Sequence, residues 1–151
     1  MIIKIDDLTD PKVEALLNDH VRNMYDITPH ESVHVFDVGQ LRKPDITFWT
    51  AWSDEDVMGC GALRELSVSH GEVKSMKTAP QHLRKGVGRE ILRTIVSEAR
   101  RRKYTRISLE TGAAKEFEPA QKLYEQFGFQ RCPPFGEYKD DPNSVFMTLE
   151  L

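Results

Sequence analysis

A short basic segment with two glycines is the part of the sequence best suited to holding a ligand. It reads APQHLRKGVGREIL over residues 79–92, and an apolar helical pattern follows Gly88 at once. The first N–H groups of a helix have no partner inside the helix, and the helix dipole places partial positive charge there. Gly86 and Gly88 lack the Cβ atoms that would keep a ligand away. The segment therefore predicts an anion-binding loop, most simply for a phosphate group.

Three classes of phosphate ligand use such a loop, and the spacing separates them. A P-loop needs Gly-Lys-Ser/Thr, whereas Arg89 and Glu90 follow Gly88 here. A dinucleotide fingerprint needs a third glycine where this chain has Ile91, and it normally belongs to the first strand–helix–strand unit. The third class is the pyrophosphate of coenzyme A. A tight turn before a surface helix is the alternative without a ligand.

Length and composition limit the other possibilities. The chain has 151 residues, 30% of them charged, and a net charge of −3. We therefore predict a single domain over residues 1–151 and no nucleic-acid partner. Cys60 and Cys132 form no CxxC pair, which fits a reduced cytoplasmic protein without a zinc site. Acidic residues come early, and no apolar run could span a bilayer, so we expect neither a signal peptide nor a membrane partner.

Strand patterns and helical patterns alternate along the chain. Helices are expected from Pro11, with Asp10 as N-cap, over about 87–103, and over about 119–127 with Gly128 as the closing residue. Strands are expected at 2–5, 46–53, 57–66, 71–79, 105–111, 129–132 and 144–151, and the loop at 31–45 should contain one short helix. Neighbouring strands imply hairpins, and the two later helices imply crossovers with some parallel pairing. The order predicts an α/β sheet covered by helices.

Two motifs in this order resemble those of the GNAT superfamily of acetyl-CoA-dependent N-acetyltransferases. The family's phosphate motif, Gln/Arg-x-x-Gly-x-Gly/Ala, maps onto LRKGVG at 83–88, with Leu83 in place of the usual Gln or Arg. The stretch EPAQKLYEQFGF at 118–129 is similar to the family's Ala-x-x-Leu-Tyr-x-x-x-Gly-Phe helix. The resemblance covers nearly the whole chain. It implies the GNAT fold, an α/β (α+β) arrangement with a mixed, mostly antiparallel central sheet and about four helices.

The resemblance also implies a reaction. Acetyl-CoA would be the co-substrate, no metal would take part, and the acetyl group would move to a primary amine by direct attack. The acceptor would be a small molecule, an amino acid or a peptide, and a homodimer is left open. The alternative is a catalytically inactive coenzyme A-binding sensor or regulatory module.

Such a reaction needs a base, an oxyanion donor and an acid near the thioester. An amine of lysine type has a pKa of about 10, so it must lose a proton before it attacks. The resemblance suggests Glu72 as the base, with Glu110 or water as alternatives, and a solvated charge at a strand start as the non-catalytic interpretation of Glu72. It places the oxyanion donor at the backbone N–H of Met76 or Lys77. Tyr124 would protonate the departing thiolate.

The binding residues fall into two predicted sets. The set for coenzyme A comprises Met76, Lys77, Thr78, Leu83, Arg84, Lys85, Gly86, Val87, Gly88, Arg89 and Tyr124. The acceptor side is expected from the first helix, the TPHESVHVFD loop and the CPPFGEYKDDPNS segment, with His34, Phe36, Phe135 and Tyr138 as candidate contacts.

Overall fold

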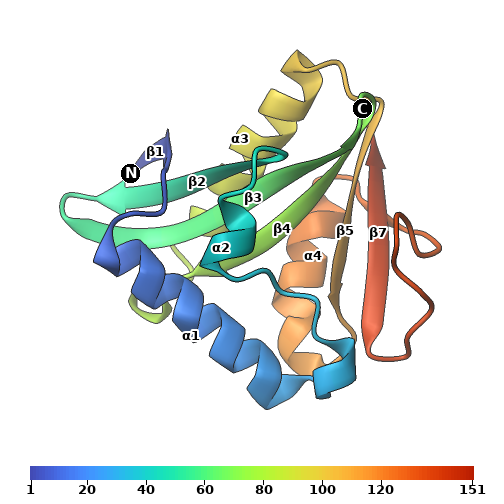
Figure 1. Cartoon of the computed structure of the whole chain (residues 1–151), viewed down its shortest axis with the longest axis horizontal. Coiled ribbons are helices and arrows are strands. Elements are labelled where there is room, and N and C mark those ends of the chain that lie inside the picture. The colour runs from blue at the N-terminus through green and yellow to red at the C-terminus, as the bar shows by residue number, and fades with distance from the viewer.

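A seven-stranded sheet forms the centre of the computed structural model, which describes all of residues 1–151 (Figure 1). The strands are β1 (Ile2–Ile5), β2 (Ile46–Ser53), β3 (Asp56–Ser67), β4 (His70–Thr78), β5 (Arg106–Gly112), β6 (Gln130–Arg131) and β7 (Ser144–Glu150). Their order in the sheet is β1-β2-β3-β4-β5-β7-β6. Only β4 and β5 pair in parallel, which confirms the predicted mixed, mostly antiparallel sheet.

Four α-helices cover the two faces of this sheet. They are α1 (Pro11–Ile27), α2 (Val38–Leu41), α3 (Val87–Arg101) and α4 (Glu118–Gln126), as predicted in number and order. Figure 1 shows α1 and α2 on one face and α3 and α4 on the other. Each face has its own apolar core, one of 19 buried residues that includes those of α3 and one of nine that includes those of α1. No helix of the chain is both long enough and apolar enough to cross a membrane.

Local signals set the ends of the helices. Asp10 accepts a hydrogen bond from the backbone N–H of Lys12 at 2.8 Å, so it caps α1 as its position before Pro11 predicts. Gly128 has a φ of 97°, the left-handed conformation that ends α4. The chain can therefore turn directly from α4 towards β6.

The strands β4 and β5 diverge in the middle of the sheet. They pair from His70 to Val73 on β4, after which β4 continues to Thr78 without β5 as a neighbour. Ser75 lies in a bulge, with a φ of 55°, where two residues of β4 face one residue of β3. The result is a V-shaped opening through which α4 is visible in Figure 1. The free edge of β4 beyond Val73 leaves backbone groups available to a ligand.

Candidate active site

A small cavity lies at the opening between β4 and β5. Its volume is about 110 Å³, and its walls come from α1, the loop after α1, β4, β5 and α4. Glu72, Met76, Glu110 and Tyr124 all line it. The structure thus brings the three candidate proton-transfer residues to one place, together with one of the two predicted oxyanion positions. Their roles stay predictions.

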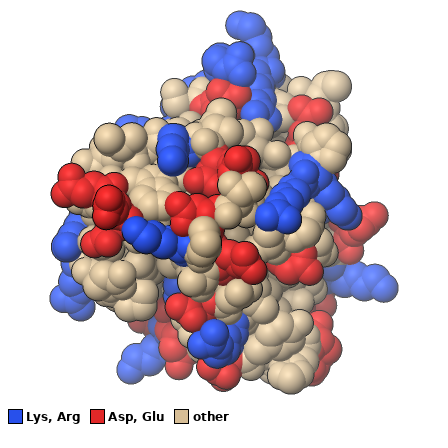
Figure 2. Space-filling model, turned by 60° about the vertical axis from the view of Figure 1, so that its left-hand side comes forward, with Lys and Arg blue, Asp and Glu red and all other residues tan.

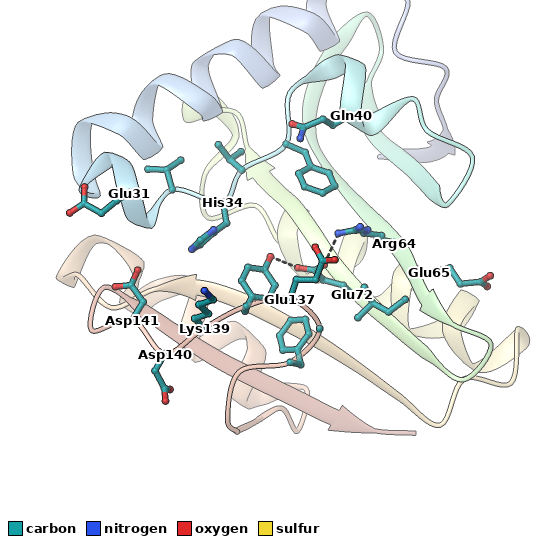
Figure 3. Close-up of a pocket in the computed structure, with 17 residues that line it drawn as sticks. Glu31, His34, Gln40, Arg64, Glu65, Glu72, Glu137, Lys139, Asp140 and Asp141 are labelled. Carbon is teal, nitrogen blue, oxygen red and sulfur yellow. Dashed lines mark hydrogen bonds and ion pairs between the residues drawn. The ribbon is translucent and has the colours of Figure 1, made fainter.

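A larger cavity of about 720 Å³ lies next to the small one (Figure 3). The four predicted acceptor contacts line it together: His34, Phe36, Phe135 and Tyr138. They come from the loop after α1 and from the segment between β6 and β7, as the sequence predicts. Only His34, Val35 and Glu72 line both cavities, so Glu72 lies at the boundary between them.

Glu72 is a buried carboxylate, with a side chain only 1% exposed. Its Oε2 accepts hydrogen bonds from the Tyr138 hydroxyl at 2.5 Å and from the Lys74 ammonium at 3.3 Å. Its Oε1 has no hydrogen-bond partner, and the nearest cation is Arg64 at 3.9 Å. The interpretation of Glu72 as a solvated charge at a strand start is therefore wrong, because β4 lies in the middle of the sheet and the Glu72 side chain is buried.

Lys74 and Arg64 belong to the site, although the sequence analysis does not name them. The Lys74 ammonium is 6% exposed and donates to Glu72, to the Tyr138 hydroxyl at 3.0 Å and to the His34 carbonyl at 3.3 Å. It also lies 4.1 Å from the centre of the Phe36 ring. Alternate residues of a strand share a face, so the pair Glu72 and Lys74 could have been found from their spacing. No local pattern points to Arg64, which reaches Glu72 across strands.

Tyr124 is the buried residue of α4. The helical spacing of Ala120, Leu123 and Phe127 predicts that these residues form the buried face of α4, with Tyr124 at its edge. This prediction is wrong, because the three apolar residues are only partly buried. Burial, with a smaller contribution from the negative charge of Glu110, raises the pKa of the Tyr124 hydroxyl. The hydroxyl therefore carries its proton at neutral pH, as a general acid must.

Glu110 lies across the small cavity on β5 and is partly buried. Burial raises the pKa of its carboxyl group, and a hydrogen bond from the Ser144 hydroxyl at 2.8 Å opposes that rise. A raised pKa suits a base that works near neutral pH, so Glu110 stays an alternative to Glu72.

The predicted phosphate loop has the geometry of an anion site. Gly86 has a φ of 79°, caps α3 without any side-chain hydrogen bond, and has open space where a Cβ would lie. The first backbone hydrogen bond at the start of α3 runs from the N–H of Glu90 to the carbonyl of Gly86 at 3.1 Å. The N–H groups of Val87, Gly88 and Arg89 precede it and have no partner within the chain. They are therefore available to a ligand.

The side chains around this loop differ in their exposure and in their hydrogen-bond partners. Leu83 is 58% exposed, and Arg84 is exposed with a φ of 63°. Lys85 lies 3.3 Å from the His82 ring, and Arg89 donates to Gln126 at the end of α4. Arg84 is therefore the loop cation whose side chain forms no hydrogen bond or ion pair within the chain.

The remaining predicted cofactor positions lie on β4, between the small cavity and the loop. Met76 packs its sulfur over Gly61, directly after the bulge at Ser75. Lys77 pairs with Cys60 of β3, and the Thr78 hydroxyl faces Gly88. A ligand that runs from the loop to the cavity would follow this part of β4. No group of three or more His, Cys, Asp or Glu residues is arranged to hold a metal ion.

His20 of α1 is a further residue that the sequence analysis does not name. It lines the small cavity, and burial, assisted by the positive charge of Lys77, lowers its pKa to about 4. An unfolded histidine has a pKa of about 6.5, so the unfolded state binds this proton first as the pH falls. The contribution of the neutral, buried His20 to the free energy of unfolding is complete above about pH 6.5 and is lost as the pH falls towards 4.

We expect His20 to make the protein about 1–2 kcal/mol less stable at pH 5 than at pH 7. Urea unfolding at the two pH values measures this difference. The His20→Gln variant should show a smaller difference, whereas His30→Gln, at an exposed position, should keep it. An equal pH dependence in wild type and His20→Gln would contradict the assignment.

Comparison with known proteins agrees with this geometry. Residues 13–129 match the model of the Acetyltransferase (GNAT) family. The chain belongs to the GNAT family. It is 55% identical over all 151 residues, and over the whole relative, to the uncharacterized N-acetyltransferase YsnE of Bacillus subtilis. It is 48% identical to the uncharacterized N-acetyltransferase YedL of Escherichia coli, over 99% of this chain and 94% of that one.

Solved structures show the same GNAT fold. A proposed acyl-CoA N-acyltransferase from Klebsiella pneumoniae superposes with a TM-score of 0.78 at 27% identity, over 99% of this chain and 97% of that one. A GNAT acetyltransferase from Elizabethkingia anophelis with acetyl-CoA bound superposes with a TM-score of 0.72 at 17% identity, over 99% and 97%. The protein is thus a GNAT N-acetyltransferase, and acetyl-CoA-dependent acetyl transfer is the general reaction of its family.

Proposed function

We propose that this GNAT protein transfers the acetyl group of acetyl-CoA to a primary amine of a small molecule, an amino acid or a peptide. The position of Glu72 carries the proposal, because this carboxylate lines both the larger cavity and the small cavity at the β4–β5 opening. An amine that enters from the larger cavity would meet a proton acceptor just before it reaches the thioester. A sensor module without turnover has no need of a carboxylate there.

The proposed reaction is a direct attack. Glu72 takes a proton from the ammonium group, and the free amine forms a C–N bond with the thioester carbon. The backbone N–H of Met76 or Lys77 stabilises the oxyanion. The C–S bond then breaks, Tyr124 gives its proton to the leaving thiolate, and the second proton of the attacking nitrogen, lost as the amide forms, restores the tyrosine. Glu110 or water would take the proton from the amine if Glu72 does not.

The proposed position of acetyl-CoA follows from two groups of free backbone atoms. Its pyrophosphate would bind the N–H groups of Val87, Gly88 and Arg89, with Arg84 beside it. Its extended arm would lie along β4 between Lys74 and Thr78, where β5 is no longer a neighbour. The neighbour from Elizabethkingia anophelis, with acetyl-CoA bound, supports acetyl-CoA as co-substrate.

Release of free thiol from acetyl-CoA tests the proposed function. The protein is incubated with acetyl-CoA and a panel of alkylamines, amino acids and short peptides, and a thiol-reactive dye follows the reaction. At least one amine should give amine-dependent thiol release with an acetylated product of the expected mass. Acetyl-CoA binding without thiol release for any amine would favour the sensor alternative.

We expect Tyr124→Phe to lower turnover by about 10- to 10²-fold, because a thiolate leaves fairly well without a proton. Acetyl-CoA affinity should change little, since the ring and its packing against Phe129 remain. Steady-state kinetics and calorimetry on the same sample measure the two effects, with Tyr25→Phe at an exposed position of α1 as the control. Full turnover would leave Tyr124 a packing residue. A collapse in acetyl-CoA binding would make it a cofactor contact instead.

A further inference from the structure

The larger cavity is acidic at its rim. Carboxylates from three parts of the chain line it and form no ion pair: Glu31, Glu65, Glu137, Asp140 and Asp141. Lys139 is the one lysine among the lining residues. Figure 3 shows Glu31 and Asp141 towards one end of the cavity, whereas the Glu65 carboxylate points away from it and accepts a hydrogen bond from the Tyr104 hydroxyl at 2.6 Å. The rim therefore attracts cations mainly at the end formed by Glu31 and the segment from Glu137 to Asp141.

This acidity is local. On the face of the molecule drawn in Figure 2, acidic and basic side chains are interspersed. Hydrogen bonds from the Ser32 hydroxyl and from the backbone N–H of Asn143 also hold the pKa of Asp141 below its usual range. Asp141 thus keeps its negative charge well below neutral pH.

The floor of this cavity, where it meets the small cavity at Glu72, has the opposite character. Two cations lie beside the Glu72 carboxylate there: Arg64 of the larger cavity at 3.9 Å and Lys74 of the small cavity at 3.3 Å. Oε1 of Glu72 is buried and lacks a hydrogen-bond donor. Every other fully buried polar side-chain atom of Glu72, Lys74 and Arg64 has a partner. A buried carboxylate oxygen without a donor is costly, and an N–H group of a bound ligand would satisfy it.

Resting on the proposed function, we propose that the acceptor is a linear diamine or polyamine, which reacts at one amine and binds the rim through a second ammonium group. The positive floor disfavours an ammonium group beside Lys74 and Arg64, so the reacting amine gives up its proton there more easily. The remote ammonium group keeps its charge among the rim carboxylates.

A substrate carboxylate is the main competitor for the floor cations, and the contacts argue against it. The three protons of the Lys74 ammonium are matched by three acceptors, on Glu72, Tyr138 and His34. Arg64 is shared between Glu72 and Asp45, the latter at 3.3 Å. Lys74 therefore has no proton left for the carboxylate of an amino acid, and Arg64 already has two carboxylates of the protein beside it.

A matched series of acceptors tests the proposal. The probes are 1,5-diaminopentane, pentylamine and 5-aminopentanoate, which differ only in the remote group, and the readout is kcat/KM from thiol release. The diamine should exceed pentylamine by about 10-fold and the amino acid by more, as expected for a few partly exposed charge pairs. Its advantage should shrink as the salt concentration rises.

Rim variants connect this advantage to the named carboxylates. In Glu137→Gln/Asp140→Asn the ratio of diamine to pentylamine kcat/KM should fall about 3- to 10-fold. The charge-matched Glu14→Gln/Glu55→Gln variant changes two exposed carboxylates outside the cavity and should keep the ratio. Equal kcat/KM for the diamine and pentylamine, or a preference for the amino acid, would overturn the inference while leaving the proposed function intact. If no amine releases thiol, the proposed function fails and the inference fails with it.

Discussion

Glu72→Gln is expected to lower the rate of acetyl transfer by about 10²-fold or more at neutral pH. Glutamine keeps the shape of the side chain but cannot take a proton from the attacking amine. The rate of thiol release at saturating acetyl-CoA and a fixed concentration of the best amine measures the effect. Wild type and variant are compared over a range of pH.

The pH profile distinguishes a base from a binding residue. At high pH the amine has already lost its proton in solution, so the rate lost in Glu72→Gln should become smaller there. An acceptor-binding role would give a similar loss at every pH. If the rates of Glu72→Gln equal those of the wild type at every pH, the role of base would pass to Glu110 or to water.

The burial of Glu72 calls for a second variant. Removing one partner of a buried ion pair costs about 3–5 kcal/mol, because Lys74 would keep its charge without a full counter-charge. Glu72→Gln alone could therefore lose activity by losing structure. The double variant Glu72→Gln/Lys74→Met removes both charges and should recover much of the stability in urea unfolding. If Glu72 is the base, the rate stays low; recovery of the rate with the stability would show that Glu72 only holds the structure together.

Local sequence signals predict much of this molecule because they act within a few residues. Asp10 caps α1 through the N–H of Lys12, and Gly128 ends α4 in a conformation that other residues adopt only with strain. Gly86 and Gly88 likewise predict the start of α3 and the free N–H groups of its first turn. The hairpins between neighbouring strands and the presence of some parallel pairing could be anticipated, since short connections join neighbouring elements; the position of β7 between β5 and β6 could not.

The features that the sequence left unresolved depend on contacts between distant segments. Glu72 obtains its partners from Arg64 on β3 and Tyr138 before β7, so its burial cannot be inferred from its neighbours in the chain. His20 reaches the small cavity because α1 crosses the sheet beside β4. Tyr124 is buried by the sheet beneath α4, and the helical pattern alone suggested a more exposed position. Tertiary packing determines all three.

Gly88→Asp is expected to weaken acetyl-CoA binding by about 10²-fold, the size of a lost charge-assisted hydrogen bond or two. The side chain would bring a carboxylate to the free N–H groups at the start of α3, where the pyrophosphate is proposed to bind. The carboxylate would both compete for these donors and repel the phosphate charge. Calorimetry with acetyl-CoA measures the affinity directly.

The fold should tolerate this change. A Cβ at Gly88 would lie 3.3 Å from the end of the Leu123 side chain and 3.8 Å from the Thr78 hydroxyl, and a flexible leucine can move by the small distance required. An acidic residue in the first turn of a helix is stabilising by about 0.3–1 kcal/mol, so the unfolding temperature should stay near that of the wild type.

Gly88→Ala separates the steric effect of an added Cβ from the effect of the negative charge of aspartate. Alanine adds the same Cβ without the carboxylate, so it should cost acetyl-CoA affinity only a fraction of what aspartate costs. Equal losses in the two variants would mean that Leu123 displacement, and not phosphate repulsion, weakens binding. Unchanged acetyl-CoA affinity in a folded Gly88→Asp protein would show that the pyrophosphate does not bind at the start of α3, because no anion could share those three N–H groups with a fixed carboxylate at no cost.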